Sequence, residues 1–119
     1  MSCCMRREAQ EAAWKFVKGV FDSSPPNIDF KKFASVAKAA PSLFMQSGLF
    51  QSLAYLNQKS DPEHKKLCAG LVNYLLGDHK TFEDIQRRLR EGPCDLMGLS
   101  DRALEWLEGV KLFASALEG

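Results

Sequence analysis

The sequence lacks the short motifs that mark the common catalytic and ion-binding sites. It contains no P-loop, no Gly-x-Ser-x-Gly turn, no His-Glu-x-x-His and no calcium-binding loop. Each of these motifs places a nucleophile, a phosphate cradle or metal ligands at a fixed spacing, and none of those spacings occurs here. We therefore expect a protein that is not an enzyme and that carries no cofactor.

Long apolar runs and paired cysteines are missing as well. No run of about 18 apolar residues occurs, and the chain does not open on a cationic and then apolar leader. There is no Cys-x-x-Cys pair, and the adjacent Cys3 and Cys4 are not expected to bridge each other. We expect a protein of the reducing cytoplasm without a membrane partner, in which Cys68 and Cys94 behave as small apolar residues.

A metal site has little support. His64 and Cys68 are four residues apart, a spacing that could hold a metal on one helix. The only conceivable further ligands, His79 and Cys94, follow at irregular distances. We expect no metal, with His64 exposed in a first helical turn and Cys68 in the core; a small metal-dependent hydrolase is the alternative that this pair leaves open.

Alternating β-branched runs, internal repeats and low-complexity tracts are also absent, whereas apolar residues recur at helical spacing almost throughout. The length of 119 residues suits one ordinary domain. We predict an all-α fold, a single compact bundle of about six or seven helices spanning residues 1–119. Trp14 and Trp106 are expected at the core or its border.

The stretch from Ala40 to Lys59 is the least polar part of the chain. Pro41 is expected in the first turn of a short helix, where the N–H that proline lacks would have no partner. Gly48 is expected to end that turn in the left-handed conformation. A new helix then starts at Leu49 and buries a stripe that continues through Leu53 and Leu56.

Carboxylates are missing from one long segment, although the whole chain has a net charge of only +1. No Asp or Glu occurs from Phe30 to Ser60, which carries four lysines. Residues 1–60 carry 8 basic and 4 acidic side chains, and residues 61–119 carry 8 basic and 11 acidic ones. A molecule with a basic half and an acidic half can attract a polyanion and can stack on its own kind.

A known signature matches the central segment in order and spacing, at Ser35-Val-Ala-Lys-Ala-Ala-Pro41, Gln46-Ser-Gly-Leu49, Gln51-Ser-Leu-Ala54 and Lys59. The chain thereby resembles the small helical subunit of the type III-B CRISPR effector, the fifth protein of the Cmr complex. A second group of residues resembles the final helix of that family: Ala103-Leu104, Leu107, Lys111, Phe113-Ala114 and Ala116. Two positions depart from the pattern, since Gly109 stands where the family often has Trp and Arg102 where it often has Glu.

The resemblance implies a non-catalytic, RNA-binding part of a ribonucleoprotein in antiviral defence. In such complexes RRM-like backbone subunits hold the guide RNA and cut the target RNA, while a large subunit makes cyclic oligoadenylate. Copies of the small subunit stack head to tail along the filament and line the groove that holds the guide–target duplex. The implied partners are the RRM-like and large Cmr subunits, further copies, guide RNA and target RNA, with no small-molecule substrate.

Candidate contact residues come from two sources. The matching signature supplies candidates for RNA or subunit contact at Lys38, Gln46, Ser47, Gln51 and Lys59. The charge pattern alone adds Lys15, Lys18, Lys31 and Lys32. The main alternative function is a helical protein–protein adaptor whose basic half meets an acidic partner and never touches RNA.

Overall fold

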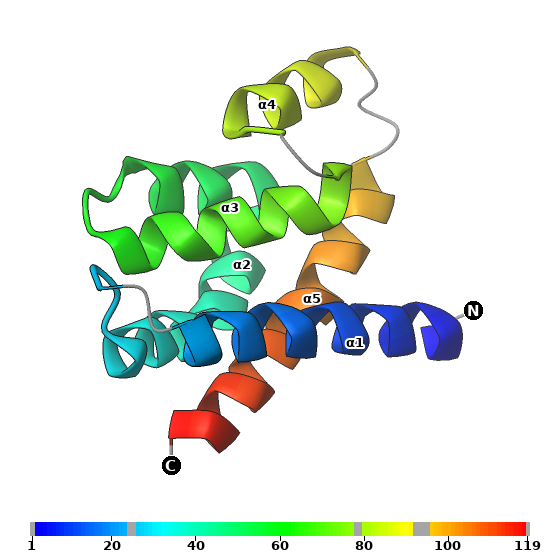
Figure 1. The fold of residues 1–119 in the computed structure, drawn as a ribbon. Coiled ribbons are helices and arrows are strands. Elements are labelled where there is room, and N and C mark those ends of the chain that lie inside the picture. Colours follow the sequence, from blue (N-terminus) through cyan, green and yellow to red (C-terminus); the bar gives the residue numbers. More distant parts are fainter. Residues whose placement is uncertain (1, 24–25, 78–79, 92–95, 119) are drawn as a thin grey trace.

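The computed structural model describes residues 2–23, 26–77, 80–91 and 96–118, and nearly all of them are helical (Figure 1). The helices are α1 (Ser2–Ser23), α2 (Phe30–Gln58), α3 (Pro62–Leu76), α4 (Phe82–Glu91) and α5 (Leu96–Glu118). No strand occurs in those ranges, so the all-α prediction is confirmed. Five helices in the described residues are close to the six or seven expected.

The predicted helix start at Pro41 is wrong, and this accounts for part of the difference in helix number. Pro41 lies inside α2 and is buried on its inner side with Ala37, Ala40 and Phe44. A proline inside a helix costs about 3 kcal/mol because it removes a hydrogen bond and crowds the preceding turn. Burial of this apolar side of α2 offsets that cost, so the helix runs through the proline.

The predicted helix break at Gly48 is confirmed, and its φ is positive, but its ψ lies far from the left-handed helical value that was expected. Its backbone angles, φ 80° and ψ 178°, lie outside the helical region, so α2 consists of two helical stretches joined by a kink at this residue. Leu49, Leu53 and Leu56 are buried beyond the bend, as their spacing predicted. Gly48 therefore redirects the helix so that both of its halves face the core.

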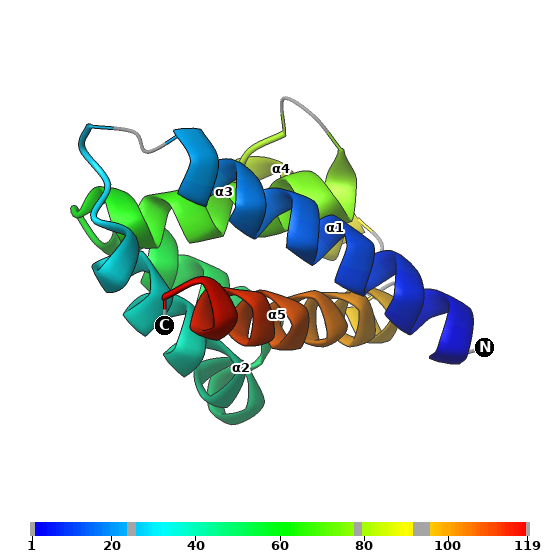
Figure 2. The ribbon, with the colours of Figure 1, turned by 60° about the horizontal axis from the view of Figure 1, so that its bottom comes forward.

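The packing is organised around α5, which lies between α1 and α2 (Figure 2). Helix α3 packs on α2 and α5, and α4 contacts α2 and α3. The core draws on all five helices; its largest fully buried side chains are Trp106, Phe33, Leu53, Leu67, Leu71, Ile85, Leu107, Val17, Val72 and Val110.

Sequence signals predict the ends of α3 correctly and the start of α5 incorrectly. The run Ser60-Asp61-Pro62-Glu63 predicts a capped helix start with proline in the first turn, and Gly77 predicts its end. The structure confirms both predictions, since Asp61 caps α3, Pro62 lies in its first turn and Gly77 ends it. The pair Ser100-Asp101 predicts the start of the last helix, and this prediction is wrong, because α5 already begins at Leu96. Ser100 and Asp101 are good capping residues, but here they lie within a helix that began one turn earlier.

Candidate functional site

The candidate lysines on the first half of α2 occupy different surroundings. Lys31 and Lys38 are seven residues apart and share one side of the helix. Lys31 is exposed, and its side chain makes no ion pair within the described residues. Lys38 donates to Glu118 near the end of α5, with Nζ 2.6 Å from Oε1. The carboxylate that α2 lacks is therefore supplied here by another helix.

Lys32 points to a different place, the start of α3. Its Nζ lies 3.7 Å from Glu63 Oε1 and 3.9 Å from Asp61 Oδ2. Glu63 is only 3% exposed and also accepts the Asp29 backbone N–H at 2.9 Å. Lys32 thus compensates the charge of the buried Glu63 and links α2 to α3. The sequence alone did not predict this structural role.

The polar candidates Gln46, Ser47 and Gln51 surround the bend at Gly48. Gln46 and Gln51 are exposed and Ser47 is half-buried. Two exposed apolar side chains, Met45 and Phe50, flank the same bend, and Phe50 stacks on Phe82 of α4 with ring centres 5.7 Å apart. The bend therefore presents amides and apolar groups together.

Lys59 follows the last turn of α2 and packs on an aromatic ring. Its Nζ lies 4.7 Å from the centre of the Tyr55 ring, within cation–π range. The same ring forms a T-shaped pair with the His64 ring, with centres 6.2 Å apart and planes 71° apart. This contact partly buries the lysine stem and leaves the amine at the junction of α2 and α3.

The two candidates on α1 lie apart from those on α2. Lys18 pairs with Asp22 at 3.0 Å, and its Nζ is 5.9 Å from the Phe21 ring centre. Lys15 is exposed at the rim of a groove between α1 and α3. The structure therefore does not gather the six candidate lysines into one face. Sequence reasoning also missed Lys66, an exposed lysine of α3 on the same groove.

The predicted exposure of His64 is wrong. Its side chain is 18% exposed, and its Nδ1 lies 2.6 Å from Asp61 Oδ2, so the imidazole helps to build the cap of α3. Cys68 is buried as predicted, and burial raises the pKa of its thiol to about 11. No group of three or more metal-ligating side chains occurs in the described ranges. His79, Cys94 and the side chains of Cys3 and Cys4 lie outside the described part.

The α3 cap predicts a dependence of stability on pH. The hydrogen bond with the His64 ring lowers the pKa of Asp61 from its ordinary 3.8, and the His64 backbone N–H lowers it further. A lowered folded-state pKa means that stability is present above pH 3.8 and is lost as the pH falls through the folded value. The free energy of unfolding should therefore fall as the pH drops from about 5 to below 3.8.

Asp61→Asn tests this expectation, because Asn also caps helices but does not titrate. In denaturant titrations over the same pH range, the variant should lose less stability than the native chain. Equal losses in both chains would contradict the assignment to Asp61.

The geometry defines a small all-α protein whose candidate contact residues lie on its surface. The family model of CRISPR-associated protein (Cas_Cmr5) matches residues 5–117, so the chain belongs to this family. A crystal structure of a CRISPR-associated Cmr5 family protein from Thermus thermophilus has the same fold, with a TM-score of 0.67. The match covers 95% of this chain and 92% of that chain at 24% sequence identity. No curated protein matches the sequence.

Family membership confirms the resemblance found in the sequence. It implies that the chain is a subunit of the type III-B CRISPR Cmr complex and associates with other Cmr subunits. Within the described ranges, no helix has the length and apolar character needed to cross a membrane.

Proposed function

We propose that this chain is a non-catalytic structural subunit of an antiviral Cmr effector in the cytoplasm. It stacks on further copies of itself along the filament and helps to hold guide and target RNA. The observation that carries this proposal is the 29-residue helix α2, which contains no Asp or Glu and exposes Lys31 without a carboxylate partner among the described residues. Residues 1–119 act as one rigid helical domain in this role.

The chemistry of α2 suits recognition of an RNA backbone. Exposed lysines neutralise phosphates in a salt-dependent way and carry no base preference. The exposed amides of Gln46 and Gln51 can donate to phosphate or 2′-hydroxyl oxygens. Sequence recognition is then left to base pairing between guide and target.

The ion pairs of the candidate lysines indicate which of them are free enough to contact RNA. The Lys38–Glu118 pair is partly exposed, with the lysine side chain 41% accessible, and such pairs contribute about 0–1 kcal/mol. A phosphate can therefore compete for Lys38. Lys32 faces the nearly buried Glu63, so its removal would leave that charge uncompensated. We place Lys31, Lys38 and Lys59 ahead of Lys32 as RNA contacts.

Changing Lys31, Lys38 and Lys59 together to Glu should preserve the helical content and weaken target-RNA binding by the assembled complex. We expect at least a tenfold loss at moderate salt and a shallower salt dependence, because up to about three phosphate contacts are removed. Equilibrium binding of labelled target RNA at several salt concentrations measures both effects. Unchanged affinity across that series would rule out this lysine set.

A charge swap separates RNA contact from the ion pair on Lys38. The double variant Lys38→Glu with Glu118→Lys keeps an opposite-charge pair at the same place. If Lys38 contacts RNA, Lys38→Glu and the swap should weaken binding, whereas Glu118→Gln should not. If Lys38 acts only through the ion pair, the swap should bind like the native chain and Glu118→Gln should be the defective variant.

A helical adaptor without RNA contact is the second candidate function. The observation in its favour is the bend of α2, where Met45 is 71% exposed beside the exposed Phe50. Exposed apolar side chains suit a protein partner better than a phosphate backbone. A complex that survives nuclease treatment and releases no nucleic acid would favour the adaptor.

A further inference from the structure

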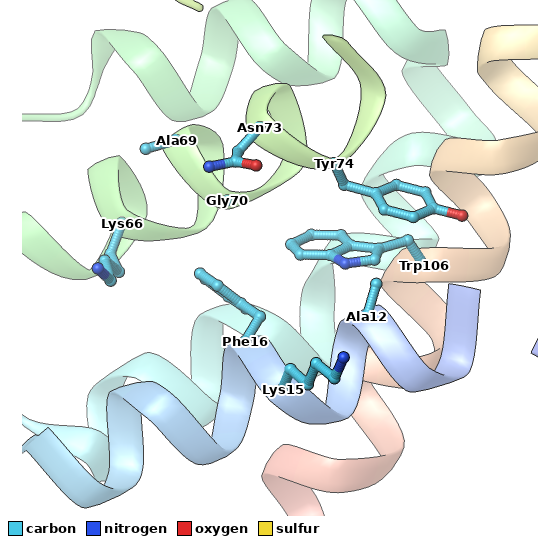
Figure 3. Close-up of a pocket in the computed structure, with 9 residues that line it drawn as sticks. All are labelled: Ala12, Lys15, Phe16, Lys66, Ala69, Gly70, Asn73, Tyr74 and Trp106. Atoms are coloured by element: carbon cyan, nitrogen blue, oxygen red, sulfur yellow. The ribbon is translucent and has the colours of Figure 1, made fainter. Parts of the chain in front are cut away.

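A groove of about 410 Å³ opens between α1 and α3, over the side of Trp106 on α5 (Figure 3). Phe16 points from α1 toward Gly70 of α3, where even a β-carbon would lie only 2.4 Å from the ring. Ala12 and Ala69 line the groove beside these residues. Small residues on both helices thus leave room above an apolar floor.

The rim of the groove is positively charged. Lys15 of α1 and Lys66 of α3 are exposed, and in the described part of the chain neither amine makes an ion pair or hydrogen bond. None of the described lining residues carries a carboxylate, and Asn73 supplies a neutral polar group (Figure 3). The groove is therefore complementary to an occupant that is apolar in its centre and acidic at its edges.

The aromatic residues under the groove favour an acidic protein segment over a nucleic acid as its occupant. Tyr74 stacks on Trp106 with ring centres 5.9 Å apart and planes 15° apart, and Phe16 packs on it at 5.1 Å. Trp106 is only 1% exposed, and Tyr74 has Trp106 stacked on it and the Arg102 guanidinium 5.3 Å from its ring centre, so neither ring offers an open face on which a nucleobase could stack. An aliphatic side chain needs no such face and fits the space above the small residues.

We infer that this groove docks an acidic amphipathic helix of another Cmr subunit. Helix-in-groove recognition places apolar residues at i, i+3 or i+4 and i+7 in the groove. Carboxylates beside that stripe would meet Lys15 and Lys66 from above. The inference rests on the association with other Cmr subunits that family membership implies, and it does not depend on RNA contact by α2.

Charge reversal at the rim tests the docking. Lys15→Glu with Lys66→Glu changes two exposed side chains and should leave the melting temperature close to that of the native chain. In the absence of target RNA, its affinity for the rest of the reconstituted complex should fall at least tenfold. The matched control, Lys80→Glu with Lys111→Glu, changes two exposed lysines outside the groove and should bind like the native chain. Equal affinities for both variants would overturn the inference.

A photo-cross-linking amino acid at Asn73 identifies the occupant in the assembled complex, with a control at the exposed Ser115. The expected product joins Asn73 to a segment of another Cmr subunit in which acidic and apolar residues recur at helical spacing. A cross-link to RNA, to a second copy of this chain, or to nothing would overturn the inference. The RNA-binding test on α2 uses other residues, so either proposal can fail without the other.

Discussion

Trp106→Ala should lower the free energy of unfolding by about 3–5 kcal/mol, the usual range for removing a buried large aromatic side chain. Trp106 is 1% exposed and packs against Phe16 of α1 and Tyr74 of α3. The substitution would remove ring contacts that join three helices and would leave a cavity at their junction. Chemical denaturation followed by circular dichroism measures the loss.

Trp14 provides the matched control, because it is the only other tryptophan in the sequence and is 39% exposed. Its ring makes an edge contact with Phe113 at 5.2 Å. Trp14→Ala should therefore cost about 1 kcal/mol, in line with loss of one aromatic pair at the surface. Similar losses for both variants would contradict the placement of Trp106 at the centre of the core.

Gly109→Leu should destabilise the chain by about 3 kcal/mol, near the upper end of the usual range for overpacking. A β-carbon at Gly109 would lie 2.9 Å from Ala13 Cβ and 3.6 Å from Gln10 Cα. These atoms belong to the body of α1 and cannot rotate away as the end of a long side chain can. Helix α1 would have to move away from α5, which separates two of the most extensively packed helices.

Gly19→Leu is the control for Gly109, because Gly19 lies in α1 with open space where its β-carbon would be. There the change should be neutral or stabilise by up to about 1 kcal/mol, since leucine favours helix more than glycine does. Thermal or denaturant unfolding of both variants gives the comparison. If Gly109→Leu is as stable as Gly19→Leu, the close approach of α1 and α5 is not required.

The same contact gives a physical reason for one departure from the family pattern. The resemblance found in the sequence leads us to expect a tryptophan at position 109, and the sequence alone offered no explanation for the glycine. The structure places it against Ala13, where two small residues let α1 and α5 approach closely. A tryptophan at this position would require a different placement of α1.

Most of the fold was predictable because its signals are local. Ala9, Ala13 and Val17 recur at helical spacing, which predicts that they share the buried side of α1, and all three are buried. Asp61 and Gly77 marked the ends of α3 correctly. The errors arose where packing outweighed a local preference, as at Pro41 inside α2 and at Ser100 inside α5.

The candidate site was less predictable, because ion pairs join residues far apart in the chain. The absence of carboxylates in α2 suggested a row of free lysines. Lys38 instead meets Glu118, 80 positions later, and Lys32 meets Glu63. The residues next to each lysine in the sequence do not show which carboxylate it will meet in the fold. Nor do they show that Lys15 and Lys66 lie on opposite sides of one groove.

The sequence by itself determined the helical class, the family and the charge asymmetry, since these depend on composition, on spacing within single segments and on a short signature. Only the tertiary structure decided which lysines have ion-pair partners among the described residues, where Trp106 packs and why residue 109 must be small. The physical reason is that burial, ion pairing and close helix approach are properties of surfaces brought together by folding. In this chain α5 packs against α1 and α2, which are far from it in the sequence. This packing determines which helix faces are buried and which remain exposed to partners.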